Sequence, residues 1–233
     1  MASTECFHFT KLKHLYSIRN IGLQPRLDKN SKAVGDTNPK VSFSDSKVGA
    51  IGLFLEFYRV YNDYKSGNRK PNPNKPGETE MYDEIMKSKS LEDYLGEGTY
   101  LLFDGTNIEN EGGNTGKGGI FDASTSHPIE SSKLKVGLIR NNETKHVSYS
   151  MYDYINYLMV NLTDDEISRM PPIMKSSMKS YMTEHYSEIS KFRDGNFSKE
   201  EIDINTFCRV CKKDIDNSIA AEHDLDNESR YIL

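Results

Sequence analysis

The sequence predicts an α+β fold: a sheet with flanking helices, followed by a helical C-terminal appendage. Two observations carry this prediction. Up to about residue 160, short segments of β-forming residues alternate with longer segments of helical periodicity. From Thr163 onward the pattern becomes helical and acidic, and Thr163 with Glu166 has the spacing of a capping box. We therefore expect an α+β domain over residues 1–162 and a helical appendage over residues 163–233.

The strands are expected where β-branched or aromatic residues cluster between turn-forming residues. In chain order these segments are CFHFTKL (6–12), KVSFS (40–44), GTYLLFDG (98–105), IFDASTSHPI (120–129) and KLKVGLIR (133–140). The glycine-rich segment 112–119 lacks the spacing and the Ser or Thr of a phosphate-binding P-loop, so we expect an ordinary loop there.

The helices are expected where apolar residues recur every three or four positions. These segments are KLKHLYSIRNIGL (11–23), VGAIGLFLEFYRVYNDY (48–64), TEMYDEIMKSKSLEDYL (79–95) and YDYINYLMVNL (152–162). Gly22 stands where the first helix needs a C-terminal residue in the left-handed region. A run rich in proline, glycine and asparagine separates the second helix from the third.

The charge is unevenly distributed along the chain. Residues 1–75 carry 13 Lys or Arg and 6 Asp or Glu, a net charge of +7, whereas residues 76–233 carry −12. A basic first third favours a phosphate-bearing ligand, and the alternative is that the two parts of the chain neutralise each other.

Composition also narrows the setting in which the protein acts. No apolar run approaches the roughly 20 residues of a membrane span, and the N-terminus has no secretion-signal pattern. Three cysteines cannot all pair with one another, which argues against a disulfide-built secreted fold. We expect a cytoplasmic protein that does not associate with membranes.

The first strand carries the clearest local pattern. His8 and Thr10 are two residues apart, so on a strand both face one side, while Phe7 and Phe9 face the other. The apolar side anchors the strand in the core, and the imidazole and hydroxyl are suited to hydrogen bonding with a ribose or phosphate. The alternative is a pair of ordinary surface residues.

Three segments together resemble a known superfamily. They are FHFT (7–10), LYSIRNIGLQPR (15–26) and KVSFSDSKVGAIGLF (40–54). Their order, a His-x-Thr strand, a helix, Gly-Leu, a loop, and a strand ending in Phe-Ser before an apolar helix, resembles the ADP-ribosyltransferase superfamily. The similarity is to the His-x-Thr branch, with the DNA-modifying toxins of toxin–antitoxin systems and the RNA 2′-phosphotransferases. It covers about residues 7–60.

The resemblance implies a split mixed or antiparallel sheet and an enzyme that uses NAD as substrate. It implies transfer of ADP-ribose to a nucleic-acid or protein acceptor, in a bacterial or phage conflict system. The implied NAD-binding residues are His8 at the ribose, Thr10 beside it, Arg26 at the pyrophosphate or the reacting centre, Ser44 and Ser46 along the nicotinamide, and Phe43 or Tyr58 stacked on its ring. We expect His8, Thr10, Arg26 and Ser44 to converge in one pocket.

The resemblance also implies an acidic residue on a late strand, beside the ribose 2′-hydroxyl. Loss of nicotinamide leaves an oxocarbenium-like ribose, which a nearby anion stabilises. Glu130 is the only Glu in the segment IFDASTSHPIESSKLKVGLI (120–139), and Asp122 and His127 are its rivals. The implied catalytic residues are therefore His8, Arg26 and Glu130.

Two other functions remain open from the sequence. His8-x-Thr10 and His146-x-Ser148 together resemble the paired motifs of 2H phosphoesterases, in which one histidine acts as base and the other as acid on a cyclic or oligonucleotide phosphodiester. A non-catalytic nucleotide-binding module is the remaining alternative.

Two features of the C-terminal segment complete the sequence analysis. Cys208 and Cys211 have metal-ligand spacing, but His223 is followed by no clear fourth ligand, so we expect two free thiols and no metal. An apolar stripe recurs at three- and four-residue steps: Ile167, Met170, Met174, Met178 and Met182. We expect it to pack on the α+β domain, and a stripe rich in methionine is also suited to binding another protein.

Overall fold

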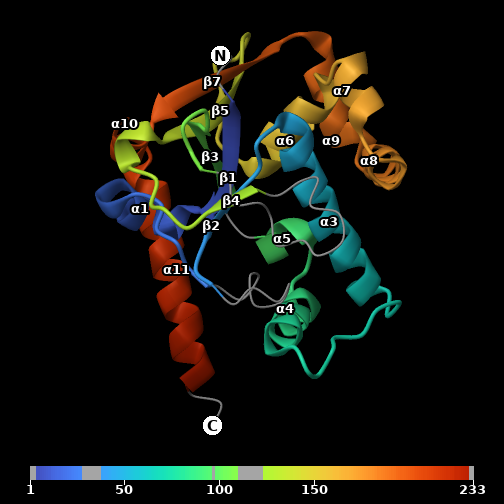
Figure 1. Ribbon diagram of the computed structural model, residues 1–233, viewed down its shortest axis with the longest axis vertical. Helices are drawn as coiled ribbons and strands as arrows, with labels where there is room; N and C mark the ends of the chain where they lie inside the picture. The colour runs from blue at the N-terminus through green and yellow to red at the C-terminus, as the bar shows by residue number, and fades with distance from the viewer. Residues whose placement is uncertain (1–3, 28–37, 96–97, 110–122, 231–233) are drawn as a thin grey trace.

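The structure, a computed structural model, describes residues 4–27, 38–95, 98–109 and 123–230. Its strands form two sheets with antiparallel pairing throughout the described residues (Figure 1). The larger sheet contains β1 (Glu5–Lys11), β3 (Gly98–Asp104), β5 (Lys135–Asn141), β6 (Val147–Ser148) and β7 (Phe197–Asp203). The smaller sheet contains β2 (Val41–Phe43) and β4 (Ala123–Thr125). The predicted α+β class is confirmed.

The strand order of the larger sheet is β1-β3-β5, and both β6 and β7 pair with β5. The small sheet adjoins β1 at one position, where Phe7 and Ser44 exchange two backbone hydrogen bonds of 2.8 and 2.9 Å. After this contact β2 leaves β1 and pairs with β4 instead. The result is a split between the two sheets that begins at Phe7.

Helices cover both faces of the larger sheet (Figure 1). Before residue 150 they are η1 (Leu12–His14), α1 (Leu15–Ile21), α3 (Lys47–Lys65), α4 (Pro76–Lys87), α5 (Leu91–Leu95) and η2 (Ser131–Lys133). After it they are α6 (Met151–Val160), α7 (Asp164–Arg169), α8 (Pro172–Glu184), α9 (Tyr186–Ser190), η3 (Lys191–Asp194), α10 (Ile204–Val210) and α11 (Lys212–Arg230).

Two of the predicted helix boundaries are informative. Gly22 ends α1 with a φ of +75°, and the capping box of Thr163 and Glu166 begins α7, as the sequence predicts. The single helix predicted over residues 79–95 is wrong. It is two helices, because Ser88 ends α4 in an extended conformation and its hydroxyl donates to the Ile85 carbonyl oxygen at 2.6 Å.

The two faces of the larger sheet bury different cores. Core 1 lies against α3, α6 and α8, and its members include Phe7, Ile51, Phe54, Tyr58, Tyr64, Tyr100, Leu102, Ile139, Tyr154, Leu158, Met174 and Tyr181. Core 2 lies against α1, α10, α11 and the small sheet, and its members include Cys6, Leu12, Leu15, Leu23, Val41, Phe43, Leu101, Phe103, Ile129, Val136, Leu138, Phe207, Cys208 and Ile215.

The segment 163–233 is part of this architecture and is not purely helical. Strand β7 pairs with β5 over its whole length, from Lys135↔Asp203 to Asn141↔Phe197. Lys199 of β7 also forms an ion pair with Glu5 of β1, and Lys135 pairs with Glu201 at 2.9 Å. The helices of this segment divide between the faces: α8 packs on core 1, and α10 and α11 pack on core 2.

Candidate functional site

The candidate site lies along one edge of β2, at the split between the two sheets. Three contacts are made there, at positions 40, 42 and 44, two residues apart. Ser44 pairs with Phe7, the Ser42 carbonyl oxygen lies 2.8 Å from Nδ1 of His8, and Lys40 pairs with Arg26 through two backbone hydrogen bonds of 3.1 and 3.3 Å. In an antiparallel pair, alternate residues point their backbone groups toward the same neighbour. One edge of β2 therefore gathers His8 and Arg26 within five residues of strand.

His8 takes the place that a continued β1–β2 pairing would fill. If the pairing begun at Phe7 and Ser44 continued, Ser42 would bond with the backbone of Phe9. Instead the imidazole of His8 reaches the Ser42 carbonyl oxygen. A carbonyl oxygen only accepts hydrogen bonds, so Nδ1 must carry the proton, and in the neutral ring Nε2 is then an acceptor. This tautomer suits a ligand that offers a hydroxyl proton.

Thr10 shares the sheet face of His8 but is buried. The register places His8 opposite Leu101 and Thr10 opposite Thr99, all on the core 2 side. Thr10 is 6% exposed and Thr99 is fully buried, and the Thr99 hydroxyl has no hydrogen-bond partner among the described residues. Phe7 and Phe9 pack on core 1, so His8 and Thr10 face the side opposite to the two rings, as predicted, and core 2 covers that side.

Arg26 and Lys40 place two cations side by side. Directly paired residues on antiparallel strands have their side chains on the same face, and like charges in that position repel each other. Arg26 is exposed, Lys40 is half-buried, and neither forms an ion pair within the described part of the chain. Lys40 lies two residues, about 7 Å, from Ser42 along the strand. Val41 and Phe43 pack in core 2, so alternation along the strand places the Lys40 side chain, and that of Arg26 beside it, on the other face of β2. The two cations therefore flank the β2 edge from the face opposite to core 2.

The two serines predicted to line the nicotinamide have structural roles here. Because Ser44 is paired with Phe7, its side chain lies on the Phe7 side of the sheet, and it is 1% exposed. The expected convergence of Ser44 with His8 and Thr10 on one face is therefore not observed. Ser46 caps α3, where its hydroxyl oxygen accepts a hydrogen bond of 3.0 Å from the Gly49 amide.

The two candidate stacking rings lie in different cores. Phe43 is buried in core 2, in an edge-to-face contact with Phe103 at a centroid distance of 5.4 Å. Tyr58 is buried in core 1, where its hydroxyl donates a hydrogen bond to Glu184. Burial is the main cause that raises the pKa of Tyr58 to about 12, with Glu184 second. The structure does not bring Tyr58 to the split.

The candidate acids are placed unequally. Glu130 is exposed next to Ile129, whose backbone pairs with Leu23, and its carboxylate accepts from the Ser132 hydroxyl at 3.3 Å. Asp122 lies outside the described residues. His127 is exposed and its Nε2 lies 3.9 Å from a carboxylate oxygen of Glu109, which is exposed too.

Asp45 is a carboxylate that the sequence reasoning did not consider. Burial is the main cause that raises the pKa of the Cys6 thiol to about 12, and the negative charge of Asp45 is the next cause. Asp45 is exposed at the junction of β2 and α3, and Cys6 is two residues before His8 on β1. A carboxylate therefore stands near the split, whereas the buried Cys6 thiol is held in its un-ionised, unreactive form.

The second histidine motif lies apart from the first. His146 is exposed in the turn between β5 and β6, and its carbonyl oxygen accepts from the Asn141 amide at 2.8 Å. Strand β6 pairs with Ile139 and Arg140 near the end of β5, whereas His8 lies opposite Leu101 of β3, which pairs with Val136 near the start of β5. His8 and His146 therefore do not face each other across a cleft between neighbouring strands, as the two histidines of a phosphoesterase would.

Cys208 in α10 and Cys211, the residue that follows this helix, are both free cysteines. Cys208 is buried in core 2, and Cys211 is half-buried. Burial raises the pKa of each thiol. Within the described ranges, no group of three His, Cys, Asp or Glu side chains is arranged to hold a metal ion.

Two signals that the site depends on were not visible in the sequence. Lys40 and the Ser42 carbonyl become site groups only because β2 leaves β1 and meets the Arg26 segment.

In the part of the chain that the structure describes, no helix has both the length and the apolar character needed to cross a membrane. No protein-family model, curated protein or solved structure matches this chain, so any statement about its activity rests on its own residues and geometry.

Proposed function

We propose that the chain binds NAD along the edge of β2 and transfers its ADP-ribose to a macromolecular acceptor, a protein or a nucleic acid. The observation that carries this proposal is that one edge of β2 holds the imidazole of His8 at the Ser42 carbonyl oxygen and the backbone of Arg26 beside Lys40. In the proposal, the His8 imidazole, held at the Ser42 carbonyl oxygen, lies beside the ribose. Arg26 and Lys40 bind the pyrophosphate, whose negative charge relieves the repulsion between them.

The proposed reaction needs no nucleophile from this protein, because the attacking group belongs to the acceptor. The bond between the ribose and nicotinamide breaks, nicotinamide leaves with the bonding electrons, and an acceptor nucleophile attacks the electron-poor ribose carbon. Positioning and a nearby carboxylate supply most of what such a step needs. Glu130 is the acid that the sequence resemblance favours, and Asp45 is the one that lies by the split.

The first test measures NAD binding by isothermal titration calorimetry. The double variant Arg26→Glu and Lys40→Glu should lower the affinity at least about tenfold, because it replaces two attractive charges by two repulsive ones. The matched control is Lys87→Glu with Lys89→Glu, which makes the same charge change at exposed positions around the end of α4. Equal loss of affinity in both double variants, or no binding by the unaltered chain, would refute the proposed site.

The second test measures transfer from labelled NAD to mixed protein and nucleic-acid targets. Glu130→Gln and Asp45→Asn each remove a negative charge at nearly constant shape from an exposed position, so each variant should fold. The variant that loses transfer while it still binds NAD identifies the acid. NAD binding without transfer in the unaltered chain would leave a nucleotide-binding module and would exclude the enzymatic part of the proposal.

A further inference from the structure

A groove on the core 1 side of the molecule is the second feature with functional character. It has a volume of about 390 Å³ and is lined by Met178, Lys179, Met182, Thr183, Tyr186 and Arg193. A neighbouring hollow of about 310 Å³ shares Met182 and Arg193 with it and extends to Asn161, Leu162 and Phe197. The two hollows adjoin at Met182 and Arg193, and we treat them as one groove beside α8 and η3. We name it the Met groove.

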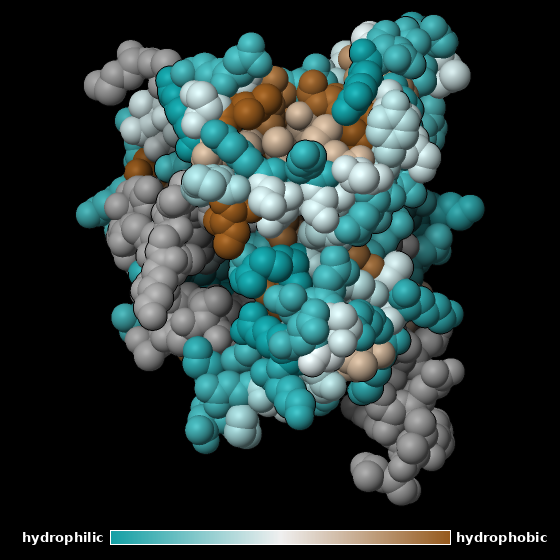
Figure 2. Space-filling model, turned by 90° about the vertical axis from the view of Figure 1, so that its right-hand side faces the viewer, coloured by the Kyte–Doolittle hydropathy of each residue, from teal (hydrophilic) through white to brown (hydrophobic). Residues whose placement is uncertain are grey.

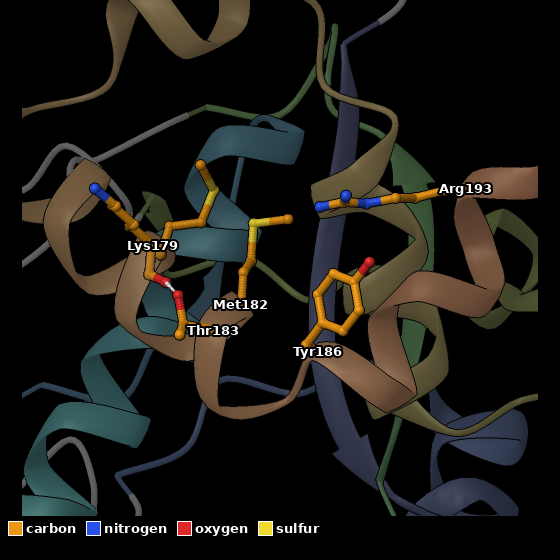
Figure 3. A pocket seen from close by; sticks show the side chains of 6 residues that line it. Lys179, Met182, Thr183, Tyr186 and Arg193 are labelled. Carbon is orange, nitrogen blue, oxygen red and sulfur yellow. Dashed lines mark hydrogen bonds between the residues drawn. The ribbon is translucent and has the colours of Figure 1, made fainter.

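The figures show how this surface is built. On the face drawn in Figure 2, apolar side chains gather near the top, where Figure 1 places α7, α8 and α9, and polar side chains surround them. Figure 3 shows Lys179, Met182 and Thr183 on one wall of the groove and Tyr186 and Arg193 on the other. Met182 and Arg193 point toward each other across the opening.

The apolar stripe of α8 continues from the core into this groove. Met170 and Met174 are buried in core 1, whereas Met178 and Met182 are only partly buried at its margin. The stripe therefore packs on the rest of the chain, as expected, but its last two methionines also line an open surface. Unbranched thioether side chains adapt their shape, which is why methionine is common on surfaces that bind apolar helix faces.

The rim of the Met groove is positively charged. Lys179 and Arg193 are exposed and make no ion pair with the described residues. Three carboxylates are near in sequence: Glu184 binds the hydroxyls of Tyr58 and Ser180, Glu188 lies 2.9 Å from Nδ1 of His185, and Asp194 is exposed next to Arg193. The charged side chains that line the groove itself are the two cations, beside the partly buried methionines.

Tyr186 adds an exposed aromatic ring to the wall of the groove. It is 60% exposed, and the Arg193 guanidinium carbon lies 5.7 Å from its ring centroid. Tyrosine and arginine are the residues most often found at the energetic centre of protein–protein contacts. A partly exposed Tyr–Arg pair beside two methionines therefore combines apolar area with a fixed positive charge.

We propose that the Met groove binds an acidic amphipathic helix of a partner protein. The apolar face of that helix would lie on Met178 and Met182, and carboxylates on its flanks would meet Lys179 and Arg193. The positive charges of Lys179 and Arg193 favour an acidic segment over a basic one. The apolar floor decides for a peptide over a nucleic acid, since a nucleic-acid surface would use aromatic stacking and more cations. This site shares no residue with the proposed NAD site, which lies at the β2 edge.

The test uses two synthetic helical peptides and fluorescence anisotropy with the full chain. Both peptides carry leucines on one face; one has glutamates on its flanks and the other has lysines at the same positions. The glutamate peptide should bind at least about tenfold more tightly, and its affinity should fall as the salt concentration rises. The double variant Lys179→Glu with Arg193→Glu should reverse this preference, whereas the control Lys87→Glu with Lys89→Glu should not change it.

The apolar contribution is tested separately. Met182→Gln keeps the length of the side chain but places an amide in the groove, and it should weaken binding of the glutamate peptide about five- to tenfold. Circular dichroism of each variant checks that the fold is retained. Equal binding of the two peptides, or no binding of either, would overturn the proposal.

Three other occupants are outcomes of the same experiment, and each would overturn it. Self-association of the unaltered chain that is lost in the Lys179→Glu and Arg193→Glu variant would assign the groove to a second copy. Binding of a fluorescent RNA oligonucleotide lost in that variant would assign it to a nucleic acid. Sedimentation with vesicles of anionic lipid, lost in the same variant, would assign it to a membrane surface.

Discussion

The two faces of the larger sheet differ in what they bury. Core 1 is rich in tyrosine, and its rings meet edge to face: Tyr181 contacts Phe54 at 5.1 Å and Tyr58 at 5.2 Å between centroids. Core 2 has no tyrosine among its buried members and is built from aliphatic residues, phenylalanines and two cysteines. Long helices close core 1, whereas core 2 is closed partly by the short strands β2 and β4.

This difference separates stability from the proposed chemistry. Core 1 contains large rings, and some of their hydroxyls donate to buried polar partners, such as Tyr64 to Glu78 at 2.9 Å and Tyr181 to Asn156 at 3.0 Å. Core 2 ends at the β2 edge, where backbone groups hold His8 and Arg26. We expect substitutions in core 1 to act on the free energy of unfolding and substitutions at the β2 edge to act mainly on ligand binding.

The largest effect is expected from Phe54→Ala in core 1. Phe54 is 1% exposed and contacts both Tyr152 and Tyr181, so the substitution leaves a cavity that rigid neighbouring rings cannot fill. The free energy of unfolding, measured by urea denaturation, should fall by about 3–5 kcal/mol. The control Ile173→Ala removes an apolar side chain that is 70% exposed, and it should change stability by less than about 0.5 kcal/mol. Similar values for the two variants would contradict the packing described for core 1.

A somewhat smaller effect is expected from Gly22→Ala, at the margin of core 2. Gly22 has a φ of +75°, and an added methyl group would overlap the carbonyl oxygen of Ile129. Gly67 also has a φ of +75° but has open space around it, so Gly67→Ala shows the cost of a positive φ without an overlap. Gly22 has in addition a ψ of −175°, a conformation that glycine alone adopts readily. We expect a loss of about 3 kcal/mol for Gly22→Ala and about 1 kcal/mol for Gly67→Ala. Equal losses would show that the Ile129 contact is not maintained in solution.

A pH-dependent effect is expected from Glu78→Gln at the margin of core 1. Burial alone would raise the pKa of Glu78, but hydrogen bonds from Arg69 and Tyr64 outweigh it and hold the pKa below its usual value. A carboxylate with a lowered folded-state pKa stabilises the fold above its unfolded-state pKa, and this contribution is lost as the pH falls through the folded-state pKa.

Glu78→Gln should therefore destabilise the protein by about 1–3 kcal/mol near neutral pH, because it weakens the 2.6 Å contact with Arg69. The difference from the unaltered chain should shrink in acid, where Glu78 is protonated. Urea denaturation at several pH values measures this, and Glu80→Gln, at an exposed position of the same helix, is the control. A difference that persists unchanged into strong acid would refute the assigned role of the carboxylate.

The elements that the sequence predicts well are those whose pattern is local. Strand β1 alternates apolar and polar residues, α3 is a long apolar helix, and Thr163 with Glu166 satisfies a capping pattern by itself. Strand β7 was not predicted, because FSKEEID has the charged composition of a solvated helix or loop. It forms a strand because β5 offers a free edge and because Lys199 and Glu201 find partners on β1 and β5. That information lies outside its own sequence.

The same limit applies to the candidate site. The His8-x-Thr10 pattern identified a strand whose His and Thr face the same side, and the resemblance to ADP-ribosyltransferases pointed to Arg26. Lys40 and the Ser42 carbonyl could not be identified in this way, since their role depends on which strand meets which edge. Tyr58 shows the opposite kind of error. The sequence reasoning placed its ring beside the nicotinamide, whereas in the structure Tyr58 is buried in core 1.

The smallest effect is expected from Thr99→Val, beneath the β1 strand on the core 2 side. The Thr99 hydroxyl is fully buried without a hydrogen-bond partner among the described residues, so folding removes it from water with no compensation. Valine has nearly the same shape and no polar atom to desolvate, and the substitution should leave stability unchanged or raise it by up to about 1 kcal/mol. Tyr181→Phe is the contrasting variant, because the Tyr181 hydroxyl donates to the buried Asn156 side chain, and its loss should cost about 1–2 kcal/mol. Thermal and urea denaturation of both variants measure the two effects. A clear loss of stability in Thr99→Val would mean that the hydroxyl has a partner in solution, such as an ordered water between the sheet and η1, and that the core 2 side is wetter than its apolar members suggest.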